Sequence, residues 1–348
     1  MSMILLNLLK IKLGSKLKFG GIYMSNVKEI INDLDNLRGT RGSKYVKDTF
    51  EDTVLKSKNP YLSYYFINTL KVNYIEKHIE NIINSKDNKL IYDTIFSSNV
   101  DLQSRDELIK TIIDSKDANY CYLIAYYVYK RNNYNTKLEQ VVLESKNPEL
   151  CYKYALNIEG ADIKGHEQVI LDSGNVEWCY KFVRDIKKAN VKALEQVVFN
   201  SNNLEYITLF ALEVEGADVN AFATKVLQSK APRWNYLFAS QVPSADILKH
   251  GSVVIESLNA EYNFVFARDI KGADIIRHEN AVIESKNIEY IYRFALDVKE
   301  ANVVELRNAL LENASKDDLD IIFNDEDFNE KYQNSIIKNK ILSLSKDN

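Results

Sequence analysis

Residues 173–200, SGNVEWCYKFVRDIKKANVKALEQVVFN, and residues 201–228, SNNLEYITLFALEVEGADVNAFATKVLQ, are successive copies of one pattern that decides the fold. Each copy opens with a serine, which we call the reference serine and from which positions are counted forwards (+) and backwards (−). The reference serines are Ser57, Ser85, Ser115, Ser145, Ser173, Ser201, Ser229, Ser257 and Ser285. The steps between them are 28, 30, 30, 28, 28, 28, 28 and 28 residues, and a further 28 residues reach Asn313. Such a period is typical of helical repeat proteins.

Each repeat carries the signals of two helices, which we call helix A and helix B. Position +2 holds a helix N-cap type in nearly every repeat, and three of the four prolines follow directly at +3. Both features predict that helix A begins there. Apolar residues at +6, +9, +10 and +13 then give helix A one buried face. Gly216-Ala217-Asp218 and similar corners supply a left-handed glycine that ends helix A and an aspartate that caps helix B.

Helices of about eleven residues cannot bury a core within one repeat, so the repeats must stack. The sequence therefore predicts an all-α fold, an α-solenoid forming a right-handed superhelix of about ten stacked two-helix repeats. We expect the repeats to span residues 44–315, with a capping helix and loop at 24–43 and C-terminal capping helices at 316–348. The two 30-residue steps predict longer A–B loops around residues 97–104 and 130–136.

Residues 1–23 precede Met24, which opens a helix-like start, and we interpret them as an extension outside the fold. Their apolar run, residues 3–9, is too short to cross a bilayer and lacks the flanks of a signal peptide. A short basic amphipathic anchor is the alternative interpretation of this segment. The expected location is cytoplasmic, without membrane insertion.

The composition narrows the functional classes. A formal charge of −4 provides no global attraction to nucleic acid, and three cysteines do not form a disulfide framework. The sequence contains no phosphate-binding glycine loop, metalloprotease helix, nucleophile elbow or CxxC pair. We therefore expect a protein that is not an enzyme, with no cofactor and no metal.

The motifs Tyr180-Lys181-Phe182 and Tyr292-Arg293-Phe294-Ala295, together with the Gly-Ala-Asp corners, resemble repeats in uncharacterised proteins of phages and low-GC bacteria. The architecture is similar to HEAT-like α-solenoids, although the present unit is shorter than the usual HEAT repeat. The resemblance covers roughly residues 44–315. It implies a fold and brings no activity.

Two chemically reactive residue types occupy fixed repeat positions. All four histidines, His78, His166, His250 and His278, stand at −7, and the three cysteines, Cys121, Cys151 and Cys179, stand at +6. Other repeats place apolar residues at both positions, and equivalent residues of adjacent repeats lie a helix-packing distance of roughly 8–10 Å apart. This separation is too long for a shared zinc ion or a disulfide. We therefore predict that both sets pack in the core.

Two rows of residues are candidate partner-binding surfaces. Tyrosine recurs at +7, where a ring can pack and its hydroxyl can reach a partner; inter-repeat packing is the competing interpretation. Glutamate recurs at −6 and an acidic residue at −1, both on helix B. In many α-solenoids the second helix lines the concave side, so these carboxylates would make the groove acidic; a plain solvated helix face is the alternative. The candidate residues are Glu139, Glu144, Glu167, Asp172, Glu195, Tyr152 and Tyr180.

From these rows we expect a non-enzymatic scaffold that recognises a partner protein along its groove, through a basic segment of the partner. The alternative is nucleic-acid binding of the kind seen in HEAT-like alkylpurine DNA glycosylases. That function needs a basic concave track, whereas this chain is net acidic. The sequence does not identify the partner or the oligomeric state.

Overall fold

The computed structural model describes residues 51–52, 54–69, 72–129, 135–326 and 328, and all of its regular elements are helices. The chain divides into two compact units, residues 1–169 and 170–348, which are described separately. The expectations for residues 1–23 and 24–43, for most of the 130–136 loop and for the last capping helix fall outside the described residues.

In the N-terminal unit, helices A and B alternate along the chain. The helices are α4 (Pro60–Thr69), α5 (Ile75–Asn84), α6 (Asn88–Ile95), α7 (Leu102–Asp114), α8 (Ala118–Val128), α9 (Thr136–Glu144) and α10 (Pro148–Asn157), followed by α11 (Ile163–Ser173), which crosses the unit boundary. Helix α4 packs against its own B helix, α5, and against the A helix of the next repeat, α6, and α6 packs in the same way against α7 and α8. The first 30-residue repeat places a six-residue corner, residues 96–101, before a long α7.

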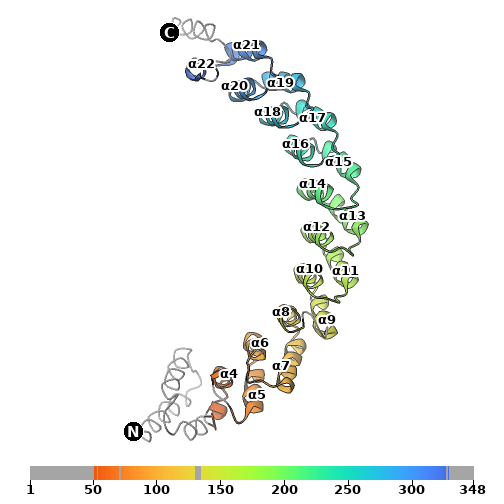
Figure 1. Ribbon diagram of the computed structural model, residues 1–348, viewed down its shortest axis with the longest axis vertical. Coiled ribbons are helices and arrows are strands. Elements are labelled where there is room, and N and C mark those ends of the chain that lie inside the picture. Colours follow the sequence, from red (N-terminus) through yellow and green to blue (C-terminus); the bar gives the residue numbers. More distant parts are fainter. Residues whose placement is uncertain (1–50, 53, 70–71, 130–134, 327, 329–348) are drawn as a thin grey trace, which may run out of the picture. The chain divides into compact units, whose positions relative to one another are not determined.

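The C-terminal unit repeats the same arrangement. Its helices are α12 (Val176–Asp185), α13 (Val191–Asn200), α14 (Leu204–Glu213), α15 (Val219–Gln228), α16 (Pro232–Gln241), α17 (Ile247–Glu256), α18 (Ala260–Asp269), α19 (Ile275–Glu284), α20 (Ile288–Asp297), α21 (Val303–Asn313) and α22 (Lys316–Asn324). Within this unit the A helices α12, α14, α16, α18 and α20 form one row and the B helices the other (Figure 1). The predicted α-solenoid of stacked two-helix repeats is thereby confirmed.

Side-chain caps set where the helices begin. Asn175 Oδ1 accepts a hydrogen bond from the amide of Trp178 at 3.1 Å at the start of α12. Asn190 Oδ1 does the same for Ala193 at 3.2 Å at the start of α13. Such caps satisfy amides that have no partner within the helix. Ala231 is an exception, since α16 begins after it without any side-chain cap.

The reference serine closes helix B. Ser229 Oγ donates to the carbonyl of Val226 at 2.6 Å and accepts the amide of Ala231 at 3.2 Å. The residue that follows each reference serine is left-handed, for example Lys230 with φ 53°. The predicted left-handed glycine of the Gly-Ala-Asp corner is also present, with φ 83° at Gly216. In the three repeats whose corner glycine is left-handed, at Gly160, Gly216 and Gly272, two such residues reverse the chain, one after helix A and one after helix B.

Apolar positions of both helices meet between the two rows to form the core. In the C-terminal unit, one cluster of buried residues includes Phe264, Val282, Ile291, Phe294 and Leu306, drawn from α18 to α21. Each repeat therefore buries its apolar residues both between its own two helices and against its neighbours.

Candidate functional site

The structure corrects the predicted acidic row at −6. Glu139 and Glu195 are only 5% and 9% exposed, so they do not present carboxylates to a partner. Glu139 Oε1 accepts the amide of Asp162 at 2.8 Å, and Glu195 Oε1 accepts the amide of Asp218 at 2.5 Å. Each donor amide lies 23 residues further along, at the N-cap of the next helix B. These glutamates connect consecutive repeats, and the positive end of a helix stabilises their buried charge.

The remaining acidic candidates differ in exposure. Glu167, also at −6, is half-buried, whereas Glu144 and Asp172 at −1 are exposed. Glu144 Oε2 lies 3.6 Å from Lys116 Nζ at the start of the same repeat, and Glu144 also accepts a hydrogen bond from Gln140 at 3.1 Å. The Gln140 hydrogen bond and the Lys116 charge lower the pKa of the Glu144 carboxyl. A continuous acidic stripe made of all five carboxylates is therefore not present.

The tyrosines at +7 connect neighbouring A helices. Tyr180 is 4% exposed, and its hydroxyl donates to Glu213 of the next repeat. Tyr236 repeats this bond to Asp269 Oδ2 at 3.0 Å, again 33 residues away. Tyr152, at the same position in the N-terminal unit, is half-buried. These contacts support the inter-repeat packing interpretation for position +7.

The histidines lie in the core, as predicted, because all four are fully buried. Each ring lies against an aromatic ring of the preceding helix A, as His250 does against Phe238 with centroids 4.9 Å apart. His166 Nε2 lies 3.0 Å from Glu139 Oε1, whereas His250 Nδ1 lies 2.8 Å from Asn235 Oδ1. The histidine thus pairs either with the −6 glutamate of the preceding repeat or with an asparagine at +6. Burial lowers the pKa of His250 to about 4.

The cysteines are also buried and free of disulfides, in agreement with the prediction. Cys179 Sγ contacts the carbonyl of Ile170 at 3.8 Å, and burial raises the pKa of this thiol to about 12. Within the described ranges, no group of three or more histidine, cysteine or acidic side chains is arranged to hold a metal ion.

Position +5, which the sequence analysis did not single out, forms an aromatic row on the A helices of the C-terminal unit. The +5 row consists of Trp178, Tyr206, Trp234, Tyr262 and Tyr290. All five side chains are half-buried, and the row includes both tryptophans of the chain. In the N-terminal unit this position holds mostly leucine, such as Leu90 and Leu150. The change at +5 from leucine to tryptophan or tyrosine is the feature of the sequence that could have identified this row.

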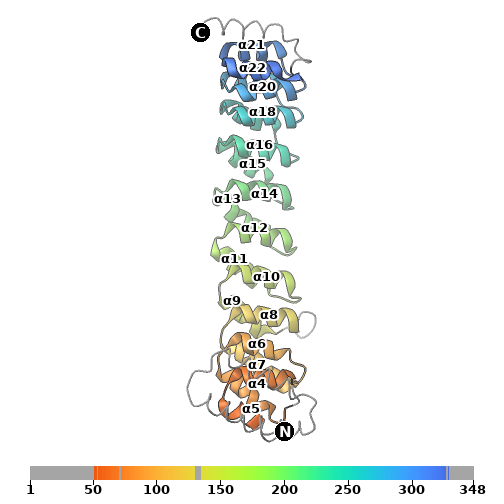
Figure 2. The ribbon, with the colours of Figure 1, turned by 90° about the vertical axis from the view of Figure 1, so that its left-hand side faces the viewer.

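Aromatic residues at +7 contact the +5 ring of the next repeat. The ring of Tyr206 lies 5.7 Å from that of Tyr180, and the ring of Tyr262 lies 6.2 Å from that of Tyr236. The +5 and +7 rings of neighbouring helices therefore lie next to each other. We call the side of the C-terminal unit formed by α12, α14, α16, α18 and α20 the A-helix face, and Figure 2 views it from the front. Fixed rings of this kind lose little conformational freedom when they bind a ligand.

Cations lie over several rings of the row. Lys181 Nζ is 4.5 Å from the centroid of the Trp178 ring, and the Arg233 guanidinium is 5.3 Å from that of Trp234. Arg293 lies over Tyr290 at 5.6 Å. The A-helix face thus combines aromatic rings with charges of both signs.

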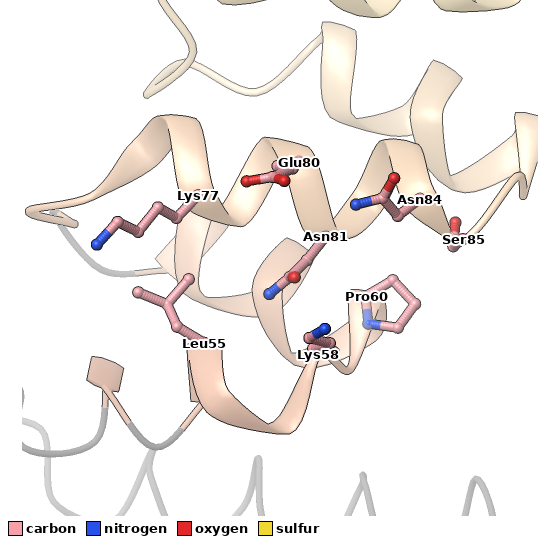
Figure 3. Close-up of a pocket in the computed structure, with 8 residues that line it drawn as sticks. All are labelled: Leu55, Lys58, Pro60, Lys77, Glu80, Asn81, Asn84 and Ser85. Atoms are coloured by element: carbon pink, nitrogen blue, oxygen red, sulfur yellow. The ribbon is translucent and has the colours of Figure 1, made fainter.

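Two hollows occupy equivalent positions in two different repeats. The larger, of about 460 Å³, is lined by Leu55, Lys58, Pro60, Lys77, Glu80, Asn81, Asn84 and Ser85 (Figure 3). The other, of about 370 Å³, is lined by Asn202, Leu204, Lys225, Gln228 and Ser229. Both are lined by positions +1 and +3, counted from one reference serine, and by positions −4 and −1, counted from the following reference serine. This recurrence indicates a gap left by stacking rather than a site built for one ligand.

Along the stretches of chain whose structure is described, every helix is too short or too polar to traverse a lipid bilayer. Comparison of the sequence with protein families and with curated proteins gives no match, and comparison with solved structures gives none either.

Proposed function

We propose that this protein is a non-enzymatic binding scaffold that docks a partner protein on the A-helix face of residues 170–348. The observation that supports this is the +5 row, which places one half-buried aromatic ring per repeat in five consecutive repeats. Tryptophan and tyrosine are the residues most enriched where protein interfaces gain their affinity. A stripe of such residues along stacked helices matches an elongated ligand.

The charge of this face favours a protein over a nucleic acid. On the five A helices the carboxylates outnumber the cations. The carboxylates are Glu177, Asp185, Glu205, Glu213, Glu261, Asp269, Glu289 and Asp297, and the cations are Lys181, Arg184, Arg233, Arg268 and Arg293. Aromatic stacking alone could also hold bases, but single-stranded nucleic acid additionally needs a positive track for its phosphates.

A random-peptide display library, selected on the full chain, tests the proposal. Selected peptides should bind the wild-type chain and lose at least about tenfold in affinity for the Trp178→Ala/Trp234→Ala variant, because interface tryptophans commonly contribute more than 1 kcal/mol each. Tyr127→Ala is the matched control, since Tyr127 is a 62% exposed aromatic residue outside the row. Because both tryptophans lie in the row, the intrinsic fluorescence of the chain should also change on binding.

Two results would contradict the proposal. One is the absence of any enriched peptide. The other is a set of peptides that bind the double tryptophan variant as tightly as the wild-type chain while both proteins retain the same helical content.

A further inference from the structure

Three consecutive repeats of the C-terminal unit carry an uncompensated charge at position +4, directly before the +5 ring. These residues are Glu205, Arg233 and Glu261, and all three are exposed. In the described part of the chain, no side chain of opposite charge lies within ion-pair distance of any of them. The neighbouring repeats differ, because Glu177 pairs with Lys181 at 2.5 Å and Glu289 pairs with Arg293 at 2.8 Å.

The sign of the uncompensated charge alternates along the row. Glu205 precedes Tyr206, Arg233 precedes Trp234, and Glu261 precedes Tyr262. The order is therefore negative, positive, negative, with one charge and one aromatic ring in each repeat. A polybasic segment would be repelled at Arg233, and a phosphate chain would be repelled at both glutamates. The ligand that complements this surface carries a positive, a negative and a positive charge.

The spacing of the repeats limits the conformation of such a ligand. Helices α14, α16 and α18 pack in sequence, and packed helices lie about 8–10 Å apart. A polyproline II segment has three residues per turn and rises about 3.1 Å per residue, so its residues i, i+3 and i+6 face one side about 9.3 Å apart. A β-strand repeats on one face about every 6.6–6.8 Å, which does not match this step. Aromatic rows are also the surfaces on which proline-rich segments dock.

We infer that residues 204–269 bind an extended polyproline II segment of a partner protein with a basic residue at i, an acidic residue at i+3 and a basic residue at i+6. The three charged residues would contact Glu205, Arg233 and Glu261 in that order or, for the opposite chain direction, in reverse. Prolines between them would pack on Tyr206, Trp234 and Tyr262. This inference rests on the proposed function and specifies the partner of the same surface.

The test uses two fluorescein-labelled peptides with opposite charge order. One contains Lys-Pro-Pro-Glu-Pro-Pro-Lys and the other contains Glu-Pro-Pro-Lys-Pro-Pro-Glu. Fluorescence anisotropy at low salt should show that the wild-type chain binds the first peptide about ten times more tightly than the second. The triple variant Glu205→Arg/Arg233→Glu/Glu261→Arg should reverse this preference, because all three residues are exposed and the substitutions invert each charge. A third peptide, with four residues between successive charges in place of two, should bind more weakly than the first.

Each outcome decides between the two proposals. If the wild-type chain binds neither peptide, or if the triple variant does not reverse the preference while keeping its helical circular dichroism, the inferred charge order is wrong. If all peptides bind equally and Trp234→Ala abolishes binding, the +5 row is still the docking surface, and only the inferred order and spacing of the ligand's charges are wrong. If peptides selected from the display library bind the Trp178→Ala/Trp234→Ala variant as tightly as the wild-type chain, the proposed function itself is wrong.

Discussion

Asn235 and His250 form a fully buried polar pair in which Asn235 Oδ1 lies 2.8 Å from His250 Nδ1. The Asn235 amide nitrogen already donates to the carbonyls of Val226 and Ala231, at 3.2 and 2.9 Å, so its oxygen is the acceptor. His250 Nδ1 therefore carries the proton. Asn263 and His278 repeat the pair at 2.7 Å in the next repeat. In the repeat before Asn235 and His250, the same two positions hold Ile207 and Phe222, which are also fully buried.

Acidification should destabilise the C-terminal unit through these histidines. Burial holds the pKa of His250 and His278 at about 4, below the ordinary value of 6.5. The unfolded chain therefore takes up protons first, so the stability is complete above pH 6.5 and falls as the pH drops from 6.5 towards 4. Each histidine should cost on the order of 3 kcal/mol by pH 4. Urea unfolding at pH 7.5, 6 and 5 measures the loss.

The Ile207–Phe222 pair supplies the control for this prediction. Asn235→Ile/His250→Phe should fold normally and show a shallower dependence of stability on pH than the wild-type chain. His250→Phe alone should cost about 1–3 kcal/mol at pH 7.5, because the Asn235 oxygen stays buried without a donor. An unchanged pH dependence in the double variant would show that His250 does not titrate in this range.

Loss of a −6 glutamate should weaken the junction between repeats. Glu195→Ala leaves the Asp218 amide without its carboxylate partner and should cost about 1–3 kcal/mol. The chain should still fold, because Ala223 and Gly251 occupy the same position in the following repeats. The exposed Glu144→Gln is the control and should change stability by less than about 0.5 kcal/mol. Equal urea midpoints for the two variants would argue against a structural role of Glu195.

The missing cap of α16 can be installed. Ala231→Asn should stabilise the chain by about 1 kcal/mol, because it adds the side-chain acceptor that the other A helices have. Asn175→Ala should remove about the same amount from α12, where Asn175 accepts the amide of Trp178. Thermal unfolding of the two variants should therefore shift in opposite directions; shifts of the same sign would mean that the caps do not limit stability.

Left-handed residues give a second matched pair. Lys230 has φ 53°, so Lys230→Gly should stabilise the chain by up to about 1 kcal/mol. Gly174→Ala should destabilise it by a similar amount, because a Cβ there meets no other atom and the effect is purely conformational. Gly216→Val should cost more than Gly174→Ala, since a β-branched residue suits φ 83° poorly. Urea midpoints rank the three variants.

The thiols provide a test of burial. Cys121, Cys151 and Cys179 are fully buried, and burial raises the pKa of each to about 12. A thiol reagent at pH 8 should therefore label the native chain far more slowly than the urea-unfolded chain, since only the thiolate reacts. Labelling at the same rate in both states would contradict the predicted core position.

The sequence by itself determined the architecture of this protein. Caps such as Asn175, corner glycines such as Gly216 and the apolar spacing of each helix act within a few residues, so their periodic recurrence predicts the helices and their stacking. The core positions of the histidines and cysteines followed from the same logic, because other repeats place apolar residues there.

Tertiary structure alone decided which recurring polar residues face the solvent. A row of glutamates at −6 looks the same in the sequence whether it is solvated or buried, and Glu195 is buried because the amide of Asp218, 23 residues away, offsets the cost of its charge. Likewise, the hydroxyl of Tyr180 at +7 donates a hydrogen bond to Glu213 of the next repeat. Trp178, two residues earlier, is only half-buried and keeps part of its side chain in contact with solvent. Burial depends on contacts between repeats. The period of the sequence predicts that equivalent residues share a face, but it does not predict which residues of the neighbouring repeat cover that face.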